Sequence, residues 1–309
     1  MQENGIHHIT AIAGNAQRNL AFYTRTLGLR LVKKTVNFDD PTTYHFYFGD
    51  AAGSPGTLIT FFPWDGIAAG RLGIGEVAEV LLRVPEDSFG FWTHRFVEKG
   101  VAHDKPETVF GENRLPFRDP DGMRLALVGL PRSGAGQGWG DGPVDAEHAI
   151  RGLHGAGLLV DEAEPTAAVL GILGYSETGR EETRVRLESG STSVGAIMEI
   201  RAAGGFLPAR MGAGSIHHIA FRASDDEMQA EMTEKLAARY RIRPTEQKDR
   251  QYFRSVYFRE PGGVLFEIAT DGPGFAIDEA PDKLGQALKL PPFLEASRSD
   301  IEAQLPEVA

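Results

Sequence analysis

The chain has 309 residues, of which 41% are hydrophobic and 24% are charged, and its formal net charge is −11. This composition is typical of a folded globular protein, and the length suits two domains of about 150 residues or one large domain. A surface this acidic repels nucleic acid and anionic membranes, so the expected partner is a small molecule. The sequence contains no cysteine, which excludes disulfides, Cys-ligated zinc, iron–sulfur clusters and thiol nucleophiles.

The chain begins with a short polar segment, MQENG, that leads directly into the apolar run IHHITAIAG. This start lacks the basic segment and the long apolar stretch of a secretory signal peptide. No run in the sequence approaches the roughly 18 consecutive apolar residues of a transmembrane helix. We therefore expect a cytoplasmic protein whose partner is neither a membrane nor a nucleic acid.

Four segments that follow one another along the chain share one layout. Each opens with a short, strand-like apolar run, at 6–14, 77–85, 153–161 and 216–224. An amphipathic stretch with helical spacing follows, at 15–28, 86–100, 162–174 and 225–240. The candidate N-caps of these helices are Asn15, Asp87 and Asp225. Three of the four stretches end at a glycine, which is typical of a helix C-terminus.

Each segment closes with strand candidates joined by a tight turn. The turn sequences are GSPG (53–56), DPDG (119–122), a Gly-Ser pair in SGSTS (189–193) and EPGG (260–263). The pattern predicts an α+β fold of four βαβββ modules, which form two curled-sheet domains, each a pair of half-barrels. A doubly wound sheet is disfavoured because strand–helix alternation stops after the first pair in each module. Coincidence among common Gly/Pro turns is the alternative explanation of the repeat.

A Gly-rich segment at 132–149 has no apolar period and is the predicted linker between the second and third modules. The predicted N-terminal domain, with modules 1 and 2, spans 1–131. The predicted C-terminal domain, with modules 3 and 4, spans 150–274. The tail at 275–309 is expected to pack as a strap with a short helix, and we assign it no chemistry.

Two positions recur in every module and can be compared between modules. The position on the opening strand is occupied by His8, Glu79, Gly155 and His218. The position four residues after Gly56, Gly122, Gly195 and Gly263 is occupied by Thr60, Ala126, Glu199 and Glu267. Because side chains alternate across a strand, equivalent positions should face equivalent directions. Two modules that curl around one cavity would therefore contribute four of these side chains to a single site.

Modules 1 and 4 together supply two imidazoles and one carboxylate, from His8, His218 and Glu267. This set forms a 2-His-1-carboxylate facial triad, which leaves coordination positions open for substrate and dioxygen. Thr60, at the fourth position, is too weak a ligand to close the site. A single histidine in an apolar strand is more often a hydrogen-bonded core residue. Here, however, His-His pairs occur at the same point of two modules, and a metal ion would offset the cost of burying them.

Tyr257 is the predicted neighbour of Glu267. It precedes Gly262 by five residues, and Glu267 follows Gly262 by five. A hairpin centred on Gly262 therefore pairs the two residues across adjacent strands. The phenol would then hydrogen-bond a substrate oxygen or ligate the metal, and an ordinary structural tyrosine is the alternative.

With these residues in place, the chain resembles the vicinal oxygen chelate superfamily of glyoxalases, bleomycin resistance proteins and extradiol dioxygenases. Within it, the chain is most similar to the hydroquinone-type ring-cleaving dioxygenases. The resemblance covers nearly the whole chain and rests on the segments GIHHITAIAGNAQRNLAFYTRTLGLRLVKKTVNFDDP, YHFYFGDAAGSPGTLITFFPW, GSIHHIAFRA and KDRQYFRSVYFREPGGVLFEIATDGPGF. The last segment is long and specific to the subfamily.

The resemblance implies one non-haem Fe(II) ion, or sometimes Mn(II), bound by the residues that match His8, His218 and Glu267. Zn(II) or another divalent ion could take its place in crystals. The resemblance also implies that Tyr257 lies at the metal. The ligand types alone do not distinguish iron from manganese, because both metals accept this set.

The resemblance further implies that His7, His217, Thr10 and Arg250 surround the bound substrate. On a regular strand His7 would face away from His8, so its role requires a twist or bulge there. His7 or His217 would act as general base or acid, because imidazole titrates near neutral pH. Arg250 would stabilise a phenolate or an anionic intermediate with its planar guanidinium, and a surface salt bridge is the alternative.

The implied reaction is the opening of a dihydroxybenzene ring, of the hydroquinone or catechol type, by dioxygen. The expected partners are therefore a small aromatic substrate and O2. We also expect a homo-oligomer, whose size the sequence does not reveal. The candidate aromatic walls of the substrate cavity are Phe61, Phe62, Trp64, Phe253 and Phe266.

Two other functions stay open. A glyoxalase-like, metal-dependent isomerase or lyase would share the fold, but this chemistry usually needs a carboxylate at the position of Thr60. A non-enzymatic protein that binds small molecules or confers resistance would not need three metal ligands. Metal analysis separates the binding protein from the two enzymes, and oxygen uptake with hydroquinone or catechol separates the enzymes from each other.

Overall fold

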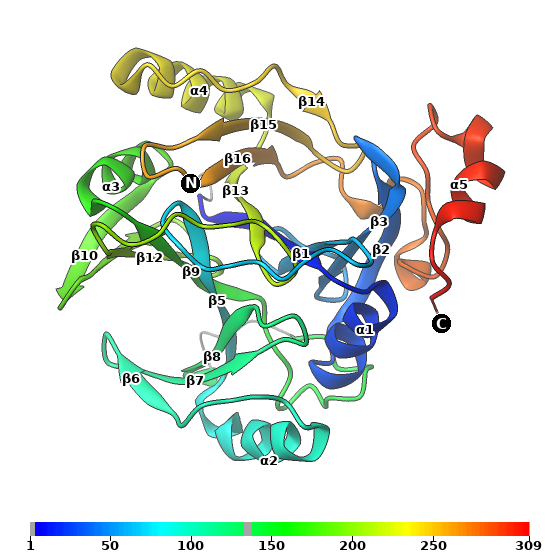
Figure 1. Ribbon diagram of the computed structural model, residues 1–309, viewed down its shortest axis with the longest axis horizontal. Helices are drawn as coiled ribbons and strands as arrows, with labels where there is room; N and C mark the ends of the chain where they lie inside the picture. The colour runs from blue at the N-terminus through cyan, green and yellow to red at the C-terminus, as the bar shows by residue number, and fades with distance from the viewer. Residues whose placement is uncertain (1–3, 133–137, 309) are drawn as a thin grey trace.

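The four predicted βαβββ modules are present in the computed structural model, which describes residues 4–132 and 138–308 (Figure 1). Module 1 contains β1 (Ile6–Ala13), α1 (Ala16–Ala21), β2 (Arg30–Asn37), β3 (Asp40–Gly49) and β4 (Leu58–Pro63). Module 2 contains β5 (Glu76–Pro85), α2 (Phe89–Lys99), β6 (Glu107–Val109), β7 (Glu112–Arg118) and β8 (Arg124–Leu130). Module 3 contains β9 (Leu153–Val160), α3 (Ala163–Ile172), β10 (Tyr175–Glu181), β11 (Arg184–Ser189) and β12 (Ile197–Ala202). Module 4 contains β13 (Ile216–Ala223), α4 (Asp226–Tyr240), β14 (Lys248–Asp249), β15 (Arg254–Arg259) and β16 (Leu265–Thr270).

The modules pair in space, and each pair builds one curled, eight-stranded sheet. Modules 1 and 4 join through the antiparallel strands β1 and β13, in the order β14-β15-β16-β13-β1-β4-β3-β2. We call this the site sheet. Modules 2 and 3 join through β5 and β9 to form the second sheet, in the order β10-β11-β12-β9-β5-β8-β7-β6. The predicted fold class and the pairing of modules 1 and 4 are therefore confirmed.

Each sheet takes strands from both halves of the chain, so the sheets do not coincide with the two predicted domains. The domain boundaries at 1–131 and 150–274 stay a prediction. Part of the predicted linker, residues 133–137, lies outside the described residues. Within the described residues, none of the helices combines the length and the apolar character that crossing a bilayer requires.

The two sheets share one apolar core. Buried side chains of the site sheet, such as Ile9 and Phe221, belong to the same cluster as Leu82 and Leu158 of the second sheet. Burial of apolar surface of this kind is the dominant favourable contribution to folding. Because side chains alternate along a strand, His8 faces the opposite side of the site sheet from Ile9. The apolar core and the polar site are thus separated by strand periodicity.

Helices cover the outer faces, with α4 above the site sheet and α2 below the second sheet in the view of Figure 1. Two N-caps are as predicted, because the side chains of Asn15 and Asp225 each accept a hydrogen bond from the amide three residues later. The N-cap predicted at Asp87 is wrong. A 3-10 turn over Glu86–Ser88 precedes α2, and Asp87 instead forms an exposed ion pair with Arg132.

One strand register is common to all four modules. Each module has one recurring position on its opening strand and one on its last strand. The residue that follows the opening-strand position by two is paired, across neighbouring strands, with the residue at the last-strand position. These pairs are Thr10 with Thr60, Leu81 with Ala126, Gly157 with Glu199, and Ala220 with Glu267. The two recurring positions therefore occupy equivalent places in every module, as strand periodicity predicted.

The C-terminal tail packs as a strap against module 1, at the right of Figure 1. The buried Lys33 amine on β2 forms ion pairs with Asp278 and Glu279 of the tail. The final helix, α5 (Arg298–Gln304), contacts β3. The strap thus supports β2 and β3, and β3 carries one wall of the cavity described next.

Candidate metal centre

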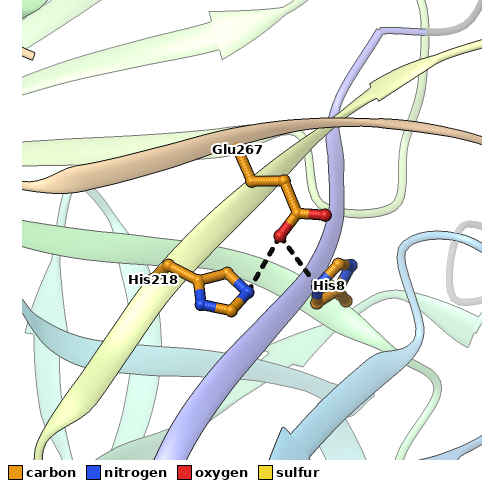
Figure 2. Close-up of side chains that lie close together, drawn as sticks. All are labelled: His8, His218 and Glu267. Atoms are coloured by element: carbon orange, nitrogen blue, oxygen red, sulfur yellow. Dashed lines mark ion pairs between the residues drawn. The ribbon is translucent and has the colours of Figure 1, made fainter. Parts of the chain in front are cut away.

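Three side chains from three neighbouring strands converge at one point of the site sheet (Figure 2). They are His8 on β1, His218 on β13 and Glu267 on β16. Their ligand atoms all lie within 4.8 Å of one another, and all three side chains are buried. Glu267 Oε2 is 2.9 Å from His218 Nε2 and 3.5 Å from His8 Nε2. The structure therefore brings together the three residues that the sequence predicted as metal ligands.

The two carboxylate oxygens of Glu267 have different surroundings. Oε1 accepts a hydrogen bond from Ser255 Oγ. Oε2 is buried and faces both imidazoles, but the contacts lack the angles of a hydrogen bond. Burial alone would raise the pKa of Glu267, yet the neighbouring His8 and His218 hold that pKa well below its usual value. The carboxylate is thus ionised at neutral pH, with one oxygen directed at the point where the imidazoles meet.

This arrangement fits a divalent metal ion. Metal–nitrogen and metal–oxygen bonds are about 2.0–2.2 Å long, so two ligands at right angles lie roughly 3 Å apart. The 2.9 Å and 3.5 Å separations between Glu267 and the two imidazoles agree with that spacing. Burial lowers the pKa of His218, so its imidazole is neutral at neutral pH and offers a lone pair. Two imidazoles and one carboxylate on one side of an ion are the ligand set of non-haem Fe(II) oxygenases.

The histidine before each imidazole ligand contacts it from the side away from the carboxylate. His7 Nδ1 lies 2.9 Å from His8 Nδ1, and His217 Nδ1 lies 2.8 Å from His218 Nδ1. These contacts form because the β1–β13 pairing has an irregularity at each first histidine, of the kind that re-aims a side chain. The bulge that the predicted role of His7 requires is therefore present. A contact at Nδ1 fixes the ring so that Nε2 faces the metal position.

Tyr257 lies directly opposite Glu267 on β15 and β16, as the hairpin predicted. Its ring is 5.7 Å from the ring of His218, in an edge-to-face arrangement. Its hydroxyl accepts a hydrogen bond from Arg250 Nε at 3.2 Å. Burial raises the pKa of Tyr257, so the hydroxyl stays protonated at neutral pH and keeps a proton to donate.

A cavity of about 200 Å³ adjoins the three ligands. Besides the ligands His8 and His218, three predicted site residues line it: His217, Arg250 and Tyr257. Three predicted aromatic walls line it as well: Phe62, Trp64 and Phe253. The other two predicted walls are wrong, because Phe61 and Phe266 lie in the apolar core on the opposite face of their strands.

Of the residues predicted to surround the substrate, His7 and Thr10 are not part of the cavity lining. His7 packs its ring 5.1 Å from that of Phe253, which does line the cavity. Thr10 Oγ1 lies 2.8 Å from Thr60 Oγ1. Both residues are therefore placed to act through a neighbour rather than by touching a ligand in the cavity.

Sequence reasoning missed His45, a half-buried cavity residue on β3. Its Nε2 lies 2.9 Å from Thr60 Oγ1, and its Nδ1 lies 2.9 Å from the hydroxyl of Tyr47. Tyr47 is paired with Thr60 across β3 and β4, so His45, two residues earlier, faces the same side. The sequence could have indicated His45, because the comparison of recurring positions between modules can be extended to the third strand of each module, which is β3 in module 1.

Curated relatives match the chain over almost its whole length. MhqO of Bacillus subtilis, provisionally named a ring-cleaving dioxygenase, is 45% identical over 306 residues, which are 97% of this chain and 95% of MhqO. The chlorohydroquinone/hydroquinone 1,2-dioxygenase of Sphingobium indicum is 32% identical and covers 96% of this chain and 94% of that enzyme. Residues 5–127 also match the family model of the glyoxalase/bleomycin resistance protein/dioxygenase superfamily.

Solved structures agree with these matches. A crystal structure from Bacillus subtilis, provisionally titled a dioxygenase, superposes with a TM-score of 0.93 at 42% identity, over 99% of this chain and 97% of that one. Glyoxalase I from Zea mays superposes with a TM-score of 0.65 at 15% identity, over 87% of this chain and 93% of that one, and shares the fold. The chain therefore belongs to the glyoxalase/bleomycin resistance protein/dioxygenase superfamily, and it groups with the members named as ring-cleaving dioxygenases.

Proposed function

We propose that this protein is a metal-dependent dioxygenase that opens the ring of a dihydroxybenzene with O2. The observation that carries the proposal is the convergence of His8, His218 and Glu267 beside a cavity with aromatic walls. The names of relatives that are 32–45% identical support ring cleavage as the reaction class. The proposed metal is Fe(II), with Mn(II) as the alternative. The cytoplasmic location and the homo-oligomeric state stay predictions.

The three ligands would hold the metal on one side only. When bound by His8, His218 and Glu267, a divalent ion would supply the activation of a phenolic substrate and of dioxygen. Thr60, at the fourth recurring position, is occupied by hydrogen bonds with Thr10 and His45. A hydroxyl in such a network does not compete with substrate for the open side.

Tyr257 and Arg250 would position the oxygen of the substrate. The hydroxyl of Tyr257 is protonated and lies next to the ligand set, where it can donate a hydrogen bond to a phenolate. Arg250 Nε donates to that hydroxyl, which holds it in place, and the planar guanidinium lies beside the developing anion. Hydrogen bonds aimed at developing negative charge are among the larger contributions to catalysis.

His217 is the proposed acceptor of the proton that the substrate hydroxyl loses. It lines the cavity, whereas His7 does not. Burial lowers the pKa of His217 to about 3, with a further contribution from His218, so the imidazole is neutral at neutral pH and has a free lone pair to accept a hydrogen bond from the substrate hydroxyl. The rings of Phe62 and Phe253 would hold the substrate ring and exclude water.

The glyoxalase-like alternative receives less support from the site. An isomerase or lyase of that kind would need a carboxylate at the fourth recurring position to ligate the metal or to move a proton. That position is Thr60, whose hydroxyl neither ionises nor takes up a proton near neutral pH. We therefore propose the oxygenase alone.

The test is anaerobic reconstitution with Fe(II), followed by an oxygen-electrode screen of substituted dihydroxybenzenes. We expect one metal ion per chain and oxygen uptake in equal amount to the ring consumed. His218→Ala is the control, because it should lose bound metal and oxygen uptake while it keeps the fold. Stoichiometric iron in the His218→Ala variant would refute the ligand assignment, and iron-loaded enzyme that consumes no oxygen with any ring would refute the reaction.

A further inference from the structure

One side chain that lines the cavity beside the candidate metal centre carries a full positive charge. Arg250 is the only lysine or arginine among the described residues that line it. Its side chain is 17% exposed, and its charge persists at any physiological pH. His45 adds no positive charge, because burial lowers its pKa well below the ordinary value. Recognition of a negatively charged substituent on the substrate would therefore depend on Arg250.

Arg250 is already paired with another residue of the cavity lining. Its Nη2 donates to Asp39 Oδ2 at 2.9 Å, while its Nε donates to the hydroxyl of Tyr257 at 3.2 Å. Asp39 lies in the turn between β2 and β3 of module 1, and Arg250 follows β14 of module 4. The hydrogen bond from Arg250 lowers the pKa of Asp39, with a smaller contribution from Lys248, so Asp39 is ionised at neutral pH. The ion pair connects the two modules that form the site.

The charges around the substrate position then limit what can bind. A divalent ion with the single carboxylate of Glu267 leaves one net positive charge, and one phenolate balances it. A second negative charge on the ring, such as a carboxylate, would meet Asp39, which also lines the cavity. Like charges that face each other across a binding site cost free energy and exclude the wrong partner.

We propose that Asp39 determines the charge of the accepted ring: its carboxylate balances the charge of Arg250, so that the pair offers no net positive charge to a second anion, and dihydroxybenzenes that carry a carboxylate are excluded. This inference rests on the proposed function and specifies the substrate class as uncharged dihydroxybenzenes. Asp39 has no contact with the ligand set and is a specificity-determining residue rather than a catalytic one. Its side chain is 61% exposed, so its replacement should leave the fold intact.

The test compares two probes that differ by one carboxylate, hydroquinone and 2,5-dihydroxybenzoate. Their dissociation constants are measured by anaerobic calorimetry on the metal-loaded enzyme, so that no turnover occurs. Wild-type enzyme should bind hydroquinone at least about tenfold more tightly, which equals about 1.4 kcal/mol. Asp39→Asn should reduce this preference by about tenfold through tighter binding of the acid, whereas Asp39→Glu should keep it.

Asp87→Asn is the matched control, because Asp87, in the 3-10 turn before α2, forms a similar exposed ion pair with Arg132. It should leave the preference unchanged. The proposal is overturned if wild-type enzyme binds both probes equally, if Asp39→Asn weakens both probes by the same factor, or if Asp87→Asn changes the preference as much as Asp39→Asn does. The proposed function fails separately, through absent oxygen uptake in air with a bound hydroquinone, so the two failures are distinguishable.

Discussion

The site sheet and the second sheet are built from the same module in the same register, but the side chains at their equivalent positions differ in kind. The recurring positions hold His8, Thr60, His218 and Glu267 in the site sheet. They hold Glu79, Ala126, Gly155 and Glu199 in the second sheet. Each sheet therefore buries a glutamate at the same place, and a buried carboxylate needs a compensating positive charge.

In the second sheet a side chain of the protein supplies that charge. The guanidinium of Arg114 donates two hydrogen bonds to Glu199, one of them at 3.0 Å. Arg186 is paired with Glu199 across neighbouring strands, where the site sheet pairs Tyr257 with Glu267. The cavity beside Glu199 measures about 90 Å³, against about 200 Å³ in the site sheet. The fold thus presents a buried carboxylate twice, and the neighbouring residue types distinguish an ion pair in the second sheet from a candidate metal centre in the site sheet.

Removal of the carboxylate in the site sheet has the largest expected effect. In Glu267→Gln the amide is a poor ligand for a divalent ion. Groups that only support a ligand are worth about 10–100-fold in metal affinity, so loss of a direct ligand should exceed about 100-fold. Metal analysis after gel filtration should find no stoichiometric iron, and oxygen uptake should vanish. A variant that keeps one iron per chain would contradict the assignment of Glu267 as a metal ligand, and with it the difference proposed between the two sheets.

The same substitution in the second sheet should change stability and not metal content. Glu199→Gln leaves the buried Arg114 without its ionised partner, and removal of one partner from a buried pair costs about 3–5 kcal/mol of unfolding free energy. Glu112 also contacts Arg114, at 3.3 Å, so we expect the lower end of that range. Urea unfolding measures the loss, and the folded fraction should still bind iron. Loss of iron at unchanged stability would mean that the two sheets do not have separate roles.

Much of this comparison could be predicted from the sequence because strand geometry is regular. Glu267 and Glu199 each follow a glycine near the turn by the same number of residues, and side chains alternate along a strand with a period of two. These two facts align the modules without coordinates. The pairing of module 1 with module 4 required one more step, namely that His8, His218 and Glu267 form a chemically complete ligand set only in that combination.

The features of the site that the sequence did not predict depend on local backbone conformation, which the sequence pattern does not encode. The contact of His7 with His8 arises from a strand irregularity, which reverses the side that alternation assigns to His7. The ion pair of Asp39 with Arg250 joins a turn to a loop 211 residues away in sequence, so neither segment carries a periodic signal. Phe61 and Phe266 were assigned to the cavity from residue type, although alternation with Thr60 and Glu267 places both in the core.

Loss of the hydroxyl of Tyr257 should have a smaller effect than loss of a ligand. Tyr257→Phe removes one hydrogen-bond donor aimed at the substrate oxygen, and one such donor is worth about 100-fold in kcat. Iron content should stay at the wild-type value, because the three ligands are intact. Tyr175→Phe is the matched control in the second sheet, since its buried hydroxyl donates to the carbonyl of Gly195 and should affect stability alone. Unchanged kcat in Tyr257→Phe would assign Tyr257 a structural role.

The smallest expected effect concerns the helices that cover the two sheets. Asn15 caps α1 of module 1 through its side chain, so Asn15→Ala should lower the unfolding free energy by about 1 kcal/mol. For a chain of this size such a loss lowers the thermal midpoint by roughly 2 °C, which calorimetry resolves. Asp87→Ala should lower it less, because Asp87 lies in the 3-10 turn before α2 and accepts no capping hydrogen bond. An equal loss in both variants would mean that the turn over Glu86–Ser88 does not replace the cap, and that module 2 begins its helix as module 1 does.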